Sequence, residues 1–288
     1  MLKLTKPSEI TKDVFVSCVN GIANKGLKAR LMACVSTIET ASNEYATKKS
    51  TQELYTITQT KTTKATKDDR VINGHVTAGE LKDLYTNQFV PQGTPGRILY
   101  DKLLSAPAYG ICPYCGVRIV STLDHFLPKG LYPLLSVTPV NLIPACKDCN
   151  TGKLSEYPKT SEEECIHPYY DDIEGFQWLS AEIVQSPRVA FKFSVEGPSH
   201  WSGLLTKRVK FHFKAYKLAE LYSTHAAVEL VNIRGALSST FNAEGSKGVQ
   251  AYLLRAATSR FDANKNSWQT AMYMAMNKDL WFCNGGFK

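Results

Sequence analysis

The order of apolar and polar positions along the chain predicts helices at both ends and a different structure in the middle. Apolar residues recur near helical spacing in several runs, and Gly21 and Gly26 are expected to break or bend the first of them. In chain order, the pattern predicts helices over residues 8–55, 78–88, 97–105, 202–235 and 247–279. The chain is therefore expected to be mainly helical.

Two further segments depart from the helical pattern. Val189, Phe191, Phe193 and Val195 alternate with other residues, which predicts a half-buried strand. Residues 56–70 are rich in Thr and Lys and hold few apolar side chains. They are predicted to form an exposed loop, or alternatively an arm that faces nucleic acid.

Length and composition bound the class of protein. The chain has 288 residues, of which 43% are hydrophobic, enough for one or two globular domains. No segment approaches the roughly 18 uninterrupted apolar residues that span a bilayer. The N-terminus also lacks the apolar core and cleavage site of a secretory signal. We therefore expect a soluble, cytoplasmic protein.

The charge balance favours an anionic partner without proving one. The formal net charge is +8, and a positive field attracts phosphate polymers. The predicted helix over 202–235 is basic in its first half, and its charged face is either a phosphate-tracking surface or an ordinary solvated face. Its basic residues are Lys207, Arg208, Lys210, Lys214 and Lys217.

Four of the eight cysteines form two CxxC pairs, Cys112 with Cys115 and Cys146 with Cys149. In a cytosolic chain such pairs indicate metal ligands rather than disulfides. Four thiolates suit Zn²⁺ in a closed tetrahedron, so this zinc is predicted to be structural. The other four cysteines are expected to be buried apolar residues.

Between and just after these pairs, chemically useful residues follow one another in a fixed order. They are Asp124, His125, Asn141, Asn150 and Lys153. At these residues the chain resembles the HNH endonuclease family, whose ββα-metal (His-Me) finger carries an Asp-His pair on its first strand, an Asn in the connecting loop and an Asn or His on the helix. Many members flank these residues with two CxxC knuckles. The resemblance covers about 45 of the 288 residues.

The residue types suit phosphodiester hydrolysis. A neutral imidazole accepts a proton from water near neutral pH, so His125 is the candidate base. Asp124 and Asn150 offer the oxygen ligands that Mg²⁺ or Mn²⁺ prefers, and such an ion would stabilise the leaving oxygen. Lys153 is a candidate phosphate contact. The resemblance implies the same roles, and it implies that Asn141 ties down the loop that orients His125.

The segment that follows the finger holds a histidine among tyrosines. His167 is expected either at the rim of the active site or in a turn of packed tyrosines. The whole chain is predicted to be α+β, mainly α, with a zinc-stapled ββα finger between two helical regions. The expected divisions are residues 1–96, 97–173 and 174–288.

The resemblance to HNH nucleases implies endonucleolytic cleavage that leaves 5′-phosphate and 3′-hydroxyl ends. The layout also resembles the HNH effectors of bacterial anti-phage systems, Septu and retron-linked, which implies an ATPase partner. DNA is the favoured substrate. Two alternatives stay open, an RNA-cleaving nuclease of the tRNA type and a non-catalytic zinc module that binds nucleic acid or protein.

Overall fold

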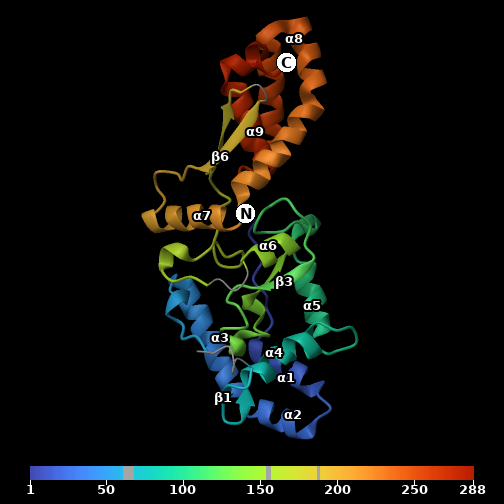
Figure 1. Ribbon diagram of the computed structural model, residues 1–288, viewed down its shortest axis with the longest axis vertical. Helices are drawn as coiled ribbons and strands as arrows, with labels where there is room; N and C mark the ends of the chain where they lie inside the picture. The colour runs from blue at the N-terminus through green and yellow to red at the C-terminus, as the bar shows by residue number, and fades with distance from the viewer. Residues whose placement is uncertain (61–67, 154–156, 187–188) are drawn as a thin grey trace. The chain divides into compact units, whose positions relative to one another are not determined.

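The computed structural model describes residues 1–60, 68–153, 157–186 and 189–288, and of Lys153 only the backbone. The chain divides into two compact units (Figure 1). The first is Leu2–Asp171, and the second is Asp172–Lys288 together with Met1. The first unit therefore combines residues 2–96 with residues 97–171, which make up most of the segment in which the finger is expected.

Three helices open the first unit: α1 (Thr11–Asn20), α2 (Lys25–Met32) and α3 (Val35–Ser50). Their buried side chains include Phe15, Leu31 and Ile38. Gly21 follows α1, as expected, whereas Gly26 is the second residue of α2. The break lies just before it, because the Asn24 side chain accepts a hydrogen bond from the Leu27 amide, at 3.0 Å, and caps α2.

The next segment continues the same core. The helices predicted over 78–88 and 97–105 are confirmed, and a Thr77–Glu80 capping box starts the first of them. Part of the predicted 56–70 loop, residues 61–67, lies outside the described residues. The elements are η1 (Leu54–Thr56), β1 (Val71–Asn73), β2 (Val76–Thr77), α4 (Ala78–Leu84), η2 (Tyr85–Phe89), α5 (Arg97–Leu104) and η3 (Ala108–Gly110).

A two-stranded hairpin and a short helix then follow one another. Strands β3 (Thr122–His125) and β4 (Leu142–Ala145) are antiparallel, and Thr122 pairs with Ala145 at one end while His125 pairs with Leu142 at the other. Helix α6 (Lys147–Lys153) packs against β3, and α5 packs against both strands. The connection between the strands contains η4 (Pro133–Leu135) and η5 (Pro139–Asn141), and η6 (Ser161–Glu163) comes after α6.

The second unit pairs one hairpin with long helices. The predicted strand is confirmed as β6 (Ala190–Val195), with Phe191, Phe193 and Val195 buried, and it pairs with β5 (Leu179–Val184). Helices α8 and α9 pack together beside this hairpin (Figure 1). The helices are α7 (Gly203–Ala215), α8 (Leu218–Ala263), α9 (Trp268–Lys278) and η7 (Phe282–Gly286).

Two details of these helices differ from the sequence pattern. Gly245 interrupts α8 with a φ of +66°, a conformation that glycine adopts without strain. The helix expected over 247–279 is split between Ala263 and Trp268, where the Asn266 side chain accepts the backbone amides of Trp178 and Leu179. The protein as a whole is α+β, with small antiparallel sheets among its helices. Within the described ranges, no helix combines the length and apolar character that crossing a bilayer requires.

Candidate metal centre and active site

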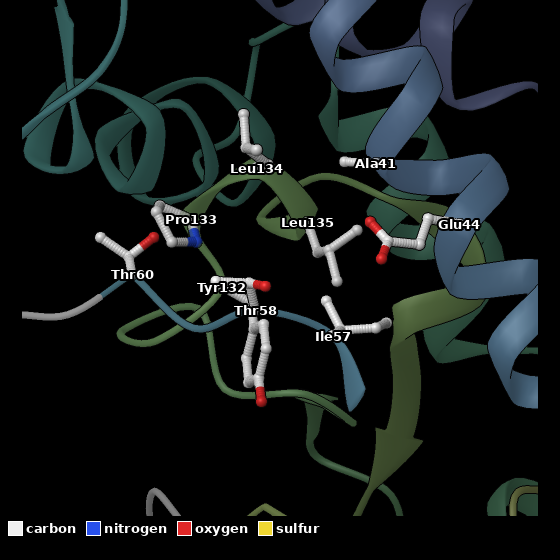
Figure 2. Close-up of a pocket in the computed structure, with 9 residues that line it drawn as sticks. All are labelled: Ala41, Glu44, Ile57, Thr58, Thr60, Tyr132, Pro133, Leu134 and Leu135. Atoms are coloured by element: carbon white, nitrogen blue, oxygen red, sulfur yellow. The ribbon is translucent and has the colours of Figure 1, made fainter. Parts of the chain in front are cut away.

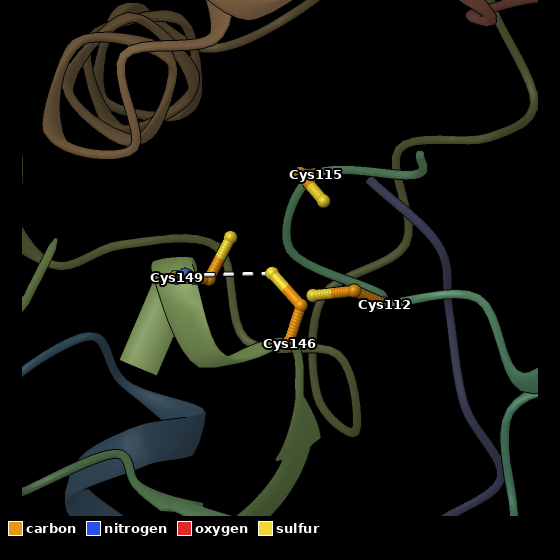
Figure 3. A group of neighbouring side chains, drawn as sticks. All are labelled: Cys112, Cys115, Cys146 and Cys149. Carbon is orange, nitrogen blue, oxygen red and sulfur yellow. Dashed lines mark hydrogen bonds between the residues drawn. The ribbon is translucent and has the colours of Figure 1, made fainter. Parts of the chain in front are cut away.

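The four paired cysteines meet in one buried cluster (Figure 3). Their sulfur atoms all lie within 4.8 Å of one another, although two come from the loop before β3 and two from the start of α6. Figure 3 shows the four side chains converging on a common centre. Four sulfurs at this spacing can surround one ion at the Zn–S distance of about 2.3 Å.

Backbone amides support the same cluster. The Arg118 amide donates to Cys115 Sγ at 3.5 Å, and the Cys149 amide donates to Cys146 Sγ at 3.4 Å. Amide donors favour the thiolate form, which is the form that binds metal. An ion pair of 2.9 Å between Arg118 and Asp148 joins the two knuckles outside the cluster. The donor set therefore fits a structural zinc ion.

The scattered cysteines behave differently. Cys18, Cys34, Cys165 and Cys283 are buried, and none belongs to the metal-binding group found among the described residues. Burial raises the pKa of the Cys18 thiol to about 12, whereas contact with Cys112 lowers the pKa of Cys146 to about 7. The first thiol is a small apolar residue, and the second belongs to the group of four sulfur donors.

His125 ends strand β3 and is held on two sides. Its Nε2 lies 2.8 Å from the Ser136 carbonyl oxygen, and its ring meets the Tyr85 ring edge to face, with 4.5 Å between centroids. A carbonyl oxygen only accepts, so Nε2 carries the proton of the neutral ring and Nδ1 carries the lone pair. The side chain is 9% exposed. The geometry therefore defines which nitrogen is basic.

Asn141 fixes the loop that contains Ser136. Its side-chain oxygen accepts the Leu127 amide at 2.8 Å, and its amide group donates to the carbonyls of Leu127, at 3.1 Å, and Leu135, at 3.3 Å. The residue is completely buried, so breaking these bonds would leave polar groups without partners. The bonds tie Leu127 and Leu135 to the segment before β4, and the role in orienting His125 that the resemblance implied for Asn141 stays a prediction.

Asp124 lies next to the metal knuckle. Tyr114, which sits between Cys112 and Cys115, donates its hydroxyl hydrogen to Asp124 Oδ2 at 3.0 Å. Both side chains are buried, and a hydrogen bond to a carboxylate is strong where water is excluded. The knuckle therefore touches the candidate metal ligand directly.

Asn150 reaches the same strand from helix α6. Its side-chain amide donates to Thr122 Oγ1 at 3.2 Å. Thr122 and Asp124 are two residues apart on β3, so they share one face of the strand, and that face looks toward Asn150. The side-chain oxygen of Asn150 is the atom left for a metal. The side chain of Lys153 lies outside the described residues.

His167 lies inside the first unit, and its side chain is 0% exposed. Its Nδ1 accepts the Tyr169 amide at 3.1 Å, so Nε2 faces the Tyr45 hydroxyl at 3.0 Å as a donor. The ring also packs on Phe126, the residue after His125, at 4.3 Å between centroids. Its place is behind the end of β3, among packed aromatic rings, and it supports that end of the strand.

A buried charged group, here called the Lys49 cluster, adjoins His167. Lys49 on α3 forms ion pairs with Glu164 and with Asp171, the latter at 3.2 Å. Asp171 Oδ2 also accepts the His167 amide at 2.8 Å, and Glu164 accepts the Leu54 amide at 3.1 Å. The cluster therefore joins α3 to the segment after the finger.

A cavity of about 210 Å³ is lined in part by residues 132–135, which directly precede Ser136 in the chain (Figure 2). Side chains from α3, from residues 57–60 and from residues 132–135 surround it in Figure 2. Its lining is mostly apolar, and Glu44 is its one ionisable group besides Tyr132, whose pKa burial raises to about 12. The described lining contains no histidine, cysteine or lysine that could act as a base beside Glu44.

Several residues near His125 escaped the sequence pattern. Tyr85, Tyr114 and Ser136 contact the candidate site directly, and Lys129 places its ammonium group 4.6 Å from the centre of the Tyr85 ring. Tyr114 had a signal, because it stands inside a metal knuckle two residues from one ligand. Tyr85 had none, since 40 residues separate it from His125.

Comparisons with known proteins find two relatives. The chain is 30% identical over 237 residues to protein ea31 of Escherichia phage lambda, covering 81% of this chain and 79% of that protein. It is 40% identical over 65 residues to the Septu protein PtuB of Bacillus thuringiensis, covering 21% of this chain and 24% of that protein. No family model matches the chain, and no solved structure matches it.

Proposed function

This chain belongs to the family of protein ea31 of Escherichia phage lambda, and we propose that it is a metal-dependent nuclease that hydrolyses phosphodiester bonds with His125 as the base. The observation that carries the proposal is the hydrogen bond from His125 Nε2 to the Ser136 carbonyl. It holds the ring in one tautomer and makes Nδ1 the proton acceptor. Asn141 keeps the accepting carbonyl in place through the loop.

Asp124 and the side-chain oxygen of Asn150 are the proposed ligands of a divalent cation. Both are hard oxygen donors. Asp124 lies on the face of β3 that the Asn150 side chain of α6 contacts at Thr122. When bound there, Mg²⁺ or Mn²⁺ would supply Lewis-acid stabilisation of charge on the leaving oxygen. Tyr114 orients the Asp124 carboxylate, and His125 takes the proton of the attacking water.

The zinc has a separate, mechanical role in this proposal. A finger of about 45 residues buries too little apolar surface to hold a precise site alone. The cysteine cluster joins the loop before β3 to the start of α6. It thereby fixes the distance between the strand that carries Asp124 and the helix that carries Asn150.

The biological setting is proposed from the two relatives. One is a phage protein, and the other, matched over a quarter of its length, is named as a Septu protein. These names support a role in the conflict between bacteria and phages, with an ATPase partner and a cytoplasmic location as further proposals. DNA is the favoured substrate, and an RNA-cleaving nuclease remains the second candidate.

The proposal is tested by incubating purified protein with plasmid DNA and with tRNA in Mg²⁺, in Mn²⁺ and in EDTA. Wild type is expected to cut at least one substrate only with the metal, and His125→Ala is expected to lower the rate at least about 100-fold. His75→Ala, which changes a surface histidine outside the site, should cut like wild type. A wild type that cuts neither substrate, also in the presence of its native co-purifying proteins, would favour the non-catalytic zinc module.

A further inference from the structure

Helix α7 presents two chemically different faces. Val209, His212 and Phe213 are buried, and so is Arg208, which the sequence had grouped with the surface lysines. Lys207, Lys210 and Lys214 are exposed on the other face, and exposed Lys217 follows the end of the helix. At 100° per residue, the three helical lysines lie within roughly 60° of the circumference. These four residues are called the lysine stripe.

The stripe concentrates the positive charge of the second unit. Residues 203–217 contain five Lys or Arg and no Asp or Glu. The rest of the unit, residues 172–202 and 218–288, holds nine of each kind and is balanced. The nearest acidic residue after the stripe along the chain is Glu220, in the first turn of α8. Residues 203–217 therefore carry the whole net positive charge of the second unit, which is +5.

Protein carboxylates do not neutralise most of this charge. Among the residues that the structure describes, Lys210, Lys214 and Lys217 take part in no ion pair. Other lysines of the molecule do, such as Lys49 with Glu164 and Lys102 with Glu9. A row of such lysines is suited to an extended anion.

We propose that the lysine stripe binds the phosphate backbone of a nucleic acid without reading its bases. Lysine is a point charge on a flexible stem, which suits phosphate contact rather than base recognition. A membrane surface fits less well, because none of the exposed large apolar residues lies on α7. This inference rests on the proposed function for the identity of the substrate, but it concerns binding and not cleavage.

The test compares two triple variants of the full chain that remove the same charge. The stripe variant carries Lys210→Gln, Lys214→Gln and Lys217→Gln. The control carries Lys192→Gln, Lys247→Gln and Lys278→Gln, which are also exposed positions of the second unit. Binding of a fluorescent 30-base-pair duplex is followed by anisotropy over a salt series in buffer without Mg²⁺ or Mn²⁺, with tRNA in parallel, and thermal unfolding checks that both variants fold.

The stripe variant is expected to bind the duplex about 10- to 100-fold more weakly at low salt, and its log–log salt slope should flatten by about 2 to 3. The control should lose less than about threefold. Equal losses in both variants would show that only net charge matters, which would overturn the proposal of a specific binding face. Binding by the stripe variant as tight as that of wild type would also overturn the proposal, and so would a wild type that does not bind. Wild type that binds without Mg²⁺ or Mn²⁺ but never cuts when either is added would leave the stripe supported and the nuclease proposal refuted.

Discussion

The two ends of the β3–β4 hairpin are held by different chemistry. At the Thr122–Ala145 end, four cysteines from two adjoining segments converge in one cluster. At the His125–Leu142 end, the Tyr169 hydroxyl donates to the Leu142 carbonyl at 3.0 Å, and His167 packs on Phe126. The Lys49 cluster lies behind that second end. The strand that carries Asp124 and His125 is therefore supported differently at its two ends.

One end of the β3–β4 hairpin is supported by a metal site, and the other end is supported by a buried polar network. A metal site stabilises the fold through a few strong metal–ligand bonds. Removal of one ligand therefore removes most of the free energy of metal binding. The Lys49 cluster instead contains several hydrogen bonds and two ion pairs. Breaking it should lower the free energy of unfolding strongly, because a buried charge would lose its partner. Substitutions at either end should therefore lower the stability of the first unit, but only those at the cysteine end should do so through loss of zinc.

The largest expected effect is at the cysteine end. Cys112→Ser or Cys149→Ser should lower zinc content from one ion per chain to nearly none and destabilise the first unit by on the order of 3 kcal/mol or more. Atomic emission and thermal unfolding measure the two quantities. Cys283→Ala, in the second unit, should keep its zinc, and full zinc in well-folded Cys149→Ser protein would contradict the assignment.

A smaller effect is expected at the other end, without loss of zinc. Glu164→Gln removes one charge from the Lys49 cluster and leaves buried Lys49 with Asp171 alone, which should cost about 3 kcal/mol. Chemical unfolding gives the free energy, and atomic emission gives the zinc content. Glu163→Gln, at the half-exposed neighbouring position, should change stability by less than about 0.5 kcal/mol. Loss of zinc in Glu164→Gln would show that the two ends are not independent.

The smallest effect on stability is expected where the cysteine end touches the site. Tyr114→Phe removes the hydroxyl that donates to Asp124 and keeps the ring, so it should cost about 1 to 2 kcal/mol and leave zinc bound. Its marker is weaker Mn²⁺ binding by a few-fold in calorimetry, because the carboxylate loses its orienting donor. Tyr109→Phe, at a residue that is 98% exposed, is the matched control. Unchanged Mn²⁺ affinity in Tyr114→Phe would show that the Tyr114 hydroxyl does not orient Asp124 for metal binding.

The sequence predicted the cysteine end but not the Lys49 cluster at the other end. Two CxxC pairs are visible because each pair is local, and paired thiols at that spacing are typical of a metal site. The Lys49 cluster had no such signal, since Lys49 and Glu164 are 115 residues apart and neither belongs to a motif. A buried lysine is identified only when folding brings its carboxylates to it.

The spacing of apolar and basic residues predicted some buried positions and missed others. The alternation around Phe191 and Phe193 predicted β6, because every second side chain faces the core. Arg208 was grouped with exposed lysines although it is 2% exposed, since spacing alone does not tell which of two adjacent basic residues faces inward. The site residues Asp124, His125 and Asn150 came from an ordered motif, and their roles remain predictions.

Chemical rescue of His125→Ala tests the central claim most directly. With plasmid or tRNA, whichever wild type cuts, added imidazole should restore a metal-dependent rate that rises with imidazole concentration, because a free ring can take the place of the missing base. Wild-type protein should not respond to the same additions. Cleavage by His125→Ala at the wild-type rate before any imidazole is added would contradict the assignment of His125 as the base.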